Sequence, residues 1–169
     1  VKKRSDKPKF LTFYPHNTTT IDDEDYGILS AGDESVEAFD TRGNKKIKFL
    51  PIGVDEKFPN LKEIFVTFSS VHKISSANFK NLKKLKKLNL MENKISSIEV
   101  GSFDDLKSLN ELILFKNQIS SLPENIFEKL NELEKIGLTS NQLKSLPAQL
   151  FKNNRKLVKI ELGFNQIEE

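Results

Sequence analysis

Few side chains in this sequence are of the types that catalyse reactions or bind metal ions. The chain of 169 residues has no cysteine and only two histidines, His16 and His72, which stand far apart in the sequence. A thiol nucleophile, a disulfide and a cysteine metal site are therefore excluded, and no hydrolase or phosphate-binding motif is present. Asp104 and Asp105 are adjacent carboxylates, but they fall in a segment that we expect to be a solvated loop. The sequence predicts that the protein is not an enzyme and uses no metal ion or cofactor.

The charged side chains favour no particular class of partner. Lysine and arginine number 27 and the acidic residues 24, which gives a net charge of +3. This mixture is typical of a solvated surface and not of a nucleic-acid-binding protein. No apolar run approaches the ~20 residues that cross a bilayer, so we expect no direct membrane insertion. The 13 phenylalanines, against no tryptophan and two tyrosines, need a structural explanation.

A lysine-rich stretch, LKKLKKLNLMENKISSI, is compatible with two structures when it is taken alone. It has the character of a basic amphipathic helix that binds an acidic membrane or a calmodulin-like groove. The spacing of its first leucines fits a helix, whereas the spacing of Leu88 and Leu90 fits a strand. The choice therefore depends on the rest of the chain.

The rest of the chain decides for the strand, because one pattern returns every 24 residues from Leu61 to Leu157. Five columns of this alignment are apolar and begin at Leu61, Ile64, Val66, Val71 and Ile74. A sixth column is Phe79, Phe103, Phe127 and Phe151, and a polar column is Asn93, Asn117, Asn141 and Asn165, preceded by Ser69. So many matches at a single period identify a tandem repeat, and the lysine-rich stretch becomes the strand side of one copy.

The pattern L-x-x-L-x-L-x-x-N-x-I-x-x-I-x-x-x-x-F-x-x-L resembles the leucine-rich repeat family, in its 24-residue type typical of extracellular proteins. The resemblance covers residues 58–169 as five repeats, the last incomplete. Residues 37–57 match as a degenerate first repeat with Glu37, Asp40 and Arg42 in apolar columns, and residues 1–36 do not match and are a possible cap. The resemblance implies an α/β solenoid with a curved parallel sheet on its concave face and irregular, short 3-10 or helical segments on its convex side.

Each column also has a physical reason. Strand side chains alternate with period two, so both strand leucines of a repeat point into the core. An asparagine amide can donate and accept hydrogen bonds where the chain leaves the sheet, so we expect Asn93, Asn117, Asn141 and Asn165 to form a structural ladder. Ser69 is shorter, and we expect a looser ladder there. The phenylalanine column fills the convex side of the core, which accounts for much of the phenylalanine excess.

Positions between the strand leucines face the concave side, where members of this family usually bind. Five apolar residues cluster there within three adjacent strands, and we interpret them as a site for a protein partner. Ordinary scatter of exposed apolar residues and cover by residues 1–36 are the alternatives. We call these five residues the concave patch: Phe65, Phe68, Met91, Ile113 and Phe115. A neighbouring column, Glu63, Lys87, Glu111 and Lys135, alternates in charge and is expected to pair across strands.

Two functions fit these features. The first is a protein-recognition module in extracellular recognition, adhesion or innate immunity, similar to secreted or receptor-borne repeat proteins of arthropods. The second is a structural or assembly role, in which the open edge at the C-terminal end joins another chain, a second copy or further sequence. The sequon Asn17-Thr18-Thr19 is a candidate glycosylation site that favours secretion, whereas the absence of disulfide-bonded caps counts against it. Apolar residues before the repeats are expected to cover the N-terminal edge of the core: Phe10, Leu11, Phe13, Ile28, Leu29 and Phe39.

Overall fold

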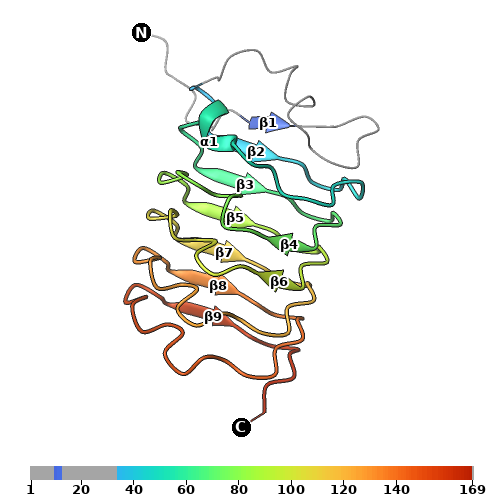
Figure 1. The fold of residues 1–169 in the computed structure, drawn as a ribbon, viewed down its shortest axis with the longest axis vertical. Helices are drawn as coiled ribbons and strands as arrows, with labels where there is room; N and C mark the ends of the chain where they lie inside the picture. The colour runs from blue at the N-terminus through green and yellow to red at the C-terminus, as the bar shows by residue number, and fades with distance from the viewer. Residues whose placement is uncertain (1–9, 13–33, 169) are drawn as a thin grey trace.

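The computed structural model describes residues 10–12 and 34–168 of the chain. In this part of the chain the strands form two parallel sheets (Figure 1). The main sheet has seven strands in the order β1-β2-β3-β5-β7-β8-β9, and a small sheet joins β4 to β6. The strands of the main sheet are β1 (Phe10–Thr12), β2 (Ala38–Asp40), β3 (Glu63–Phe65), β5 (Lys87–Asn89), β7 (Glu111–Ile113), β8 (Lys135–Gly137) and β9 (Lys159–Glu161). The remaining elements are the helix α1 (Val54–Lys57) and the strands β4 (Lys73–Ile74) and β6 (Ser97–Ile98).

Each repeat contributes one short strand to the main sheet. From β3 onwards, successive strands pair in register 24 residues apart, so that Ile64 lies beside Leu88 and Leu88 beside Leu112. Figure 1 shows these strands stacked along the long axis of the molecule, with the N-terminal strands at one end and β9 near the other. The architecture confirms the predicted solenoid of 24-residue repeats with a parallel sheet and little helix.

The core is built from the apolar columns. In β3, β5 and β7 the central residue is buried while its neighbours are partly exposed, as for Leu88 between Lys87 and Asn89. Behind the sheet, the phenylalanine column forms a continuous stack. The ring centroids of Phe79 and Phe103, and of Phe103 and Phe127, are 6.1 Å apart, and the last step to Phe151 is 5.8 Å. Each repeat therefore buries its aromatic ring against those of its neighbours, and no repeat can form this core alone.

The asparagine column makes the same hydrogen bonds in the four repeats that contain it. The Asn117 amide nitrogen donates to the carbonyl oxygens of Leu90, at 3.0 Å, and Leu114, at 3.1 Å. Its side-chain oxygen accepts the backbone N–H of Ile95 at 3.0 Å. Equivalent donor and acceptor bonds are made by Asn93, Asn141 and Asn165. Because Leu90 and Ile95 belong to the preceding turn, each amide joins two turns. The Ser69 hydroxyl donates to the carbonyl oxygen of Thr67 at 3.2 Å, within its own repeat.

The first repeat is shifted by one residue relative to the predicted alignment. β2 pairs Phe39, and not Asp40, with Ile64 of β3. The strict 24-residue period, which placed Glu37, Asp40 and Arg42 in apolar columns, was therefore wrong at this repeat. One extra residue lies between this strand and Ile47, and a slip of one residue moves every strand side chain to the other face. The residues that are buried at the core positions of this repeat are Val36, Phe39 and Thr41.

β1 adds an edge strand on the N-terminal side of the first repeat. Phe10 pairs with Ala38 and Leu11 with Phe39, in the same parallel sense as the repeats. The backbone of residues 10–12 thus covers the edge of β2, and Phe39 is itself part of the core. Phe13, Ile28 and Leu29, which were also expected to cover this edge, lie outside the described residues.

Candidate functional site

The concave patch lies on the outward positions of the main sheet. Along the stacked strands, Phe65 pairs with Asn89 and Asn89 with Ile113. Met91 and Phe115 follow two residues after Asn89 and Ile113, so alternation places them on the same face. This face is opposite the buried leucines of the same strands. Four of the five predicted patch residues therefore share one surface over β3, β5 and β7.

Phe68 occupies a different place from the other four residues. Its backbone is left-handed, with φ of 54°, at the point where the chain leaves the strand. The same left-handed conformation recurs at the equivalent position of every later repeat, at Glu92, Lys116, Ser140 and Phe164. Phe68 is 42% exposed, whereas the other four patch residues are half-buried. Thr67, in the row of Met91 and Phe115, is buried, so the patch does not extend through that position.

The Phe65 ring lies between two cationic side chains. The Arg42 guanidinium carbon is 5.3 Å and the Lys87 Nζ is 5.9 Å from the ring centroid, within the range of cation–π attraction. Both cations also have carboxylate partners, because Arg42 binds Asp40 and Lys87 lies 2.7 Å from a carboxylate oxygen of Glu111. The two cations beside the Phe65 ring are thus each paired with a carboxylate of this chain.

The Phe115 ring lies over the backbone of the next strand. A Cβ atom added to Gly137 would meet Phe115 Cε1 at 2.1 Å, a distance that two carbon atoms cannot share. The missing side chain at Gly137 is therefore what leaves room for this ring on β8. Gly137 was not predicted to be part of the site. The sequence signal that could have identified it is a glycine at the repeat position that Phe65, Asn89 and Ile113 occupy in the preceding copies.

Ion pairs border the concave patch along both sides. Lys87 pairs with Glu111 on one side, and Lys116 Nζ lies 2.7 Å from Glu92 Oε1 on the other. The first pair belongs to the charge-alternating column, as predicted. Lys159, which continues that column, pairs instead with Glu161 of its own strand, at 2.9 Å. The borders of the patch consequently carry charges of both signs.

Among residues 10–12 and 34–168, no three side chains of His, Cys, Asp or Glu are grouped so that they could hold a metal ion. His72 is exposed. A hydrogen bond from Lys73, and a smaller contribution from the backbone N–H of Ser76, hold the pKa of the partly exposed Glu99 carboxyl below its ordinary value. Lys73 and Glu99 also form an ion pair at 2.5 Å beside the small sheet, so this shift belongs to a surface contact.

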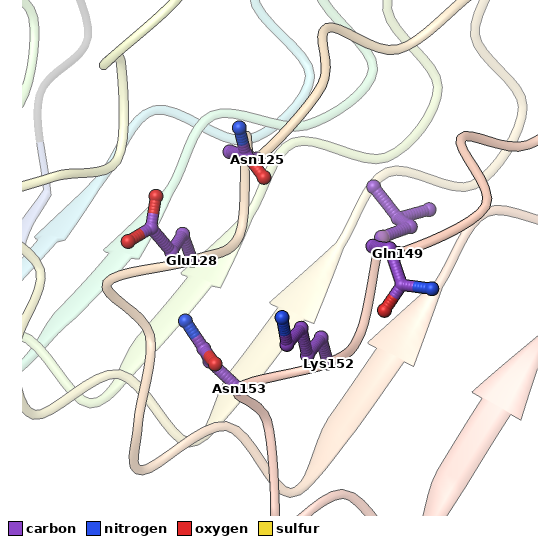
Figure 2. Close-up of a pocket in the computed structure, with 6 residues that line it drawn as sticks. Asn125, Glu128, Gln149, Lys152 and Asn153 are labelled. Carbon is purple, nitrogen blue, oxygen red and sulfur yellow. The ribbon is translucent and has the colours of Figure 1, made fainter.

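A polar hollow lies on the convex side of the third and fourth full repeats. It has a volume of about 200 Å³. Figure 2 shows side chains from two neighbouring turns around it. They are Asn125, Glu128, Gln149, Leu150, Lys152 and Asn153. Its polar side chains are largely exposed to solvent, and it has none of the apolar lining that usually encloses a ligand-binding cavity, apart from Leu150.

Two further predictions concern glycosylation and membrane insertion. Asn17, the candidate glycosylation site, lies outside the described residues. Within those residues, no helix has both the length and the apolar character that crossing a bilayer requires.

Comparison with known proteins supports the repeat architecture. Residues 59–119 and 108–167 each match the family model described as "Leucine rich repeat". No curated protein matches the chain. A solved structure titled "Crystal structure of TLR13-ssRNA13 complex" superposes with a TM-score of 0.65 at 23% sequence identity. The match covers 76% of this chain and 19% of that chain, and at this identity the likeness concerns the fold alone.

Proposed function

The chain belongs to the leucine-rich repeat family, and from this premise we propose that it recognises a protein partner through the concave patch. The observation that carries the proposal is the position of Phe65, Met91, Ile113 and Phe115 on the outward face of a sheet whose other face is already filled by the core. Aromatic and large apolar side chains at the centre of an interface commonly supply most of the binding energy. A family that is generally non-catalytic and a site without catalytic groups both agree with a binding role.

A nucleic-acid partner has less support, although the TLR13 structure is titled as a complex with RNA. Nucleic-acid binding depends on unpaired positive charge facing the phosphates. On this concave face Arg42, Lys87 and Lys116 each have a carboxylate partner, and the whole chain carries a net charge of only +3. The apolar patch therefore favours a protein surface.

We further propose that the protein acts outside the cell, in recognition, adhesion or innate immunity. The 24-residue repeat type and the sequon at Asn17 support this location, and the absence of cysteine opposes it. Peptide mass spectrometry of the natural protein provides the test. A glycan on Asn17 requires passage through the secretory pathway, whereas a fully unmodified Asn17 leaves the extracellular proposal without its main support.

Removing two aromatic rings of the patch tests the binding role. The double variant Phe65→Ala with Phe115→Ala is expected to weaken partner binding by about 10- to 30-fold. Its melting temperature should change little, because both rings are half-buried and lie outside the core. The partner is first captured from the native fluid or tissue with the wild-type chain, and affinities are then measured by calorimetry. A double variant that fails to fold, or one that binds the captured partner as the wild type does, contradicts the assignment.

A second candidate function is assembly through the end of the solenoid. β9 is the last strand of the main sheet within the described residues, and Ile160 and Phe164 are 45% and 87% exposed there. An unpaired strand edge beside apolar side chains favours association with another chain. In sedimentation experiments, residues 1–169 should dimerise at high concentration, and Ile160→Lys should prevent this. A wild-type chain that stays monomeric at every concentration would exclude self-association through this edge.

A further inference from the structure

Four residues of the concave patch, all except Phe68, form a stripe that runs across the strands. Phe65 belongs to β3, Met91 follows β5, and Ile113 and Phe115 lie on or just after β7. The Phe115 ring continues the stripe onto β8, where Gly137 has no side chain. The apolar surface thus crosses four strands, which at ~4.8 Å per strand gives a length of about 14 Å. Its long direction is the stacking axis of the repeats.

The strands beneath this stripe offer no backbone groups to a partner. β3, β5, β7 and β8 are each paired with a strand on both sides. An extended segment lying on this face would therefore gain no ladder hydrogen bonds, and its own N–H and C=O groups would lose water without replacement. A helix satisfies its backbone groups internally and can bury one face at no such cost.

The spacing of the stripe also matches a helix. Neighbouring strands are separated by ~4.8 Å, close to the rise of one helical turn, about 5.4 Å. Side chains on one face of an extended strand recur every ~6.7 Å and would fall out of step with the sheet. The stripe is as long as about two and a half helical turns, enough for apolar residues at positions i, i+3 or i+4, and i+7.

From these features we infer that the occupant of the concave patch is an amphipathic α-helix of a protein partner, lying across the strands with its apolar face on the stripe. This inference rests on the proposed function, because it specifies which kind of partner the patch binds. The bordering pairs Lys87–Glu111 and Lys116–Glu92 carry charges of both signs. They face the polar sides of the helix and require no net charge from it.

Gly137 positions the aromatic ring at one end of this helix site. In the free protein the Phe115 ring already lies on β8, so it does not have to be ordered when the helix binds. A methyl group at Gly137 would displace the ring without removing it. Gly163, two residues after the end of β9, provides a control, because a Cβ atom there meets only Thr139 Cγ2, at the ordinary contact distance of 3.9 Å.

The helix inference can be tested with two displayed peptide libraries of equal composition, each about 16 residues long. One library places apolar residues with helical period, and the other alternates them with strand period. Both are selected on immobilised wild-type chain and rescreened on the Phe65→Ala, Phe115→Ala double variant. We expect binders from the helical library, with affinity about tenfold lower for the double variant.

The possible outcomes separate the helix inference from the proposed function. Binders that are sensitive to the double variant but come from the strand library alone would overturn the helix and leave the patch as a binding site. If neither library yields binders that the double variant weakens, both the helix and the binding role of the patch are wrong. For binders from the helical library, circular dichroism of the complex measures whether the bound peptide is helical, and a bound peptide without helix would also overturn the inference.

The glycine pair tests the role of Phe115 in the same assay. Gly137→Ala is expected to weaken the selected helical peptides about tenfold, while Gly163→Ala should stay within about twofold of the wild type. Both variants should keep the wild-type melting temperature closely, because the Phe115 ring can rotate towards solvent. Equal effects of the two substitutions would show that the position of the ring on β8 does not matter for binding.

Discussion

Replacing Phe103 by alanine is expected to lower the free energy of unfolding by about 3–5 kcal/mol, the usual cost of deleting a buried aromatic side chain. Phe103 is fully buried, and its ring stacks on Phe79 and Phe127 at the same centroid distance of 6.1 Å. Removing the Phe103 ring would therefore leave a cavity that borders both the preceding and the following repeat. Because each repeat is stable only against its neighbours, the loss should destabilise the central part of the solenoid.

Urea unfolding followed by circular dichroism measures this effect as a lower midpoint. Phe164→Ala is the matched control, because Phe164 is 87% exposed and its truncation should change the free energy by less than about 0.5 kcal/mol. Phe151, at the far end of the stack, is only partly buried, so Phe151→Ala should cost less than Phe103→Ala. Equal costs for Phe103→Ala and Phe164→Ala would contradict the aromatic stack as a source of stability.

Asn117→Ala is expected to destabilise the protein by about 1–3 kcal/mol, because its backbone partners remain buried without a hydrogen bond. The partners are the carbonyl oxygens of Leu90 and Leu114 and the N–H of Ile95. Two of these groups belong to the preceding repeat, so the substitution weakens the junction between turns. A water molecule has little room to replace the amide, since Asn117 is only 7% exposed.

The control for the ladder is the adjacent substitution Lys116→Ala. Lys116 forms an exposed ion pair with Glu92, and such pairs contribute at most about 1 kcal/mol and often nothing measurable. Unfolding by urea should therefore separate the two variants clearly. If Asn117→Ala and Lys116→Ala have the same midpoint, the buried amide is not what joins the turns.

The repeats from β3 to β9 could be predicted from the sequence because every copy faces the same environment as the copy before it. A side chain type that returns every 24 residues identifies its own column, as Phe79, Phe103 and Phe127 do. Burial then follows from strand alternation and from the need to cover each repeat with the next. The same logic identified Phe65, Met91, Ile113 and Phe115 as outward positions. Their binding role is still a prediction.

The first repeat could not be predicted in the same way, because it is a single irregular copy. A fixed period assigned Asp40 to the core, and one additional residue before Ile47 was enough to exchange the two faces of the strand. In the folded protein Asp40 instead binds Arg42, which lies over the Phe65 ring. The register was decided by the burial of Phe39, which a strict alignment left out of the core columns.

The details of the candidate site depended on contacts between columns. Alternation predicts that Phe115 points outward, but not that its ring lies on the neighbouring strand. Gly137 is 22 positions away in the sequence and belongs to another row, and only the stacking of β7 on β8 brings the two together. From β3 onwards, the sequence by itself determined the repeat, the core columns and the face that Phe65, Met91, Ile113 and Phe115 occupy, because these depend on periodicity. The tertiary structure decided which side chains on that face meet, because this depends on the direction of each side chain and on the space that its neighbour leaves.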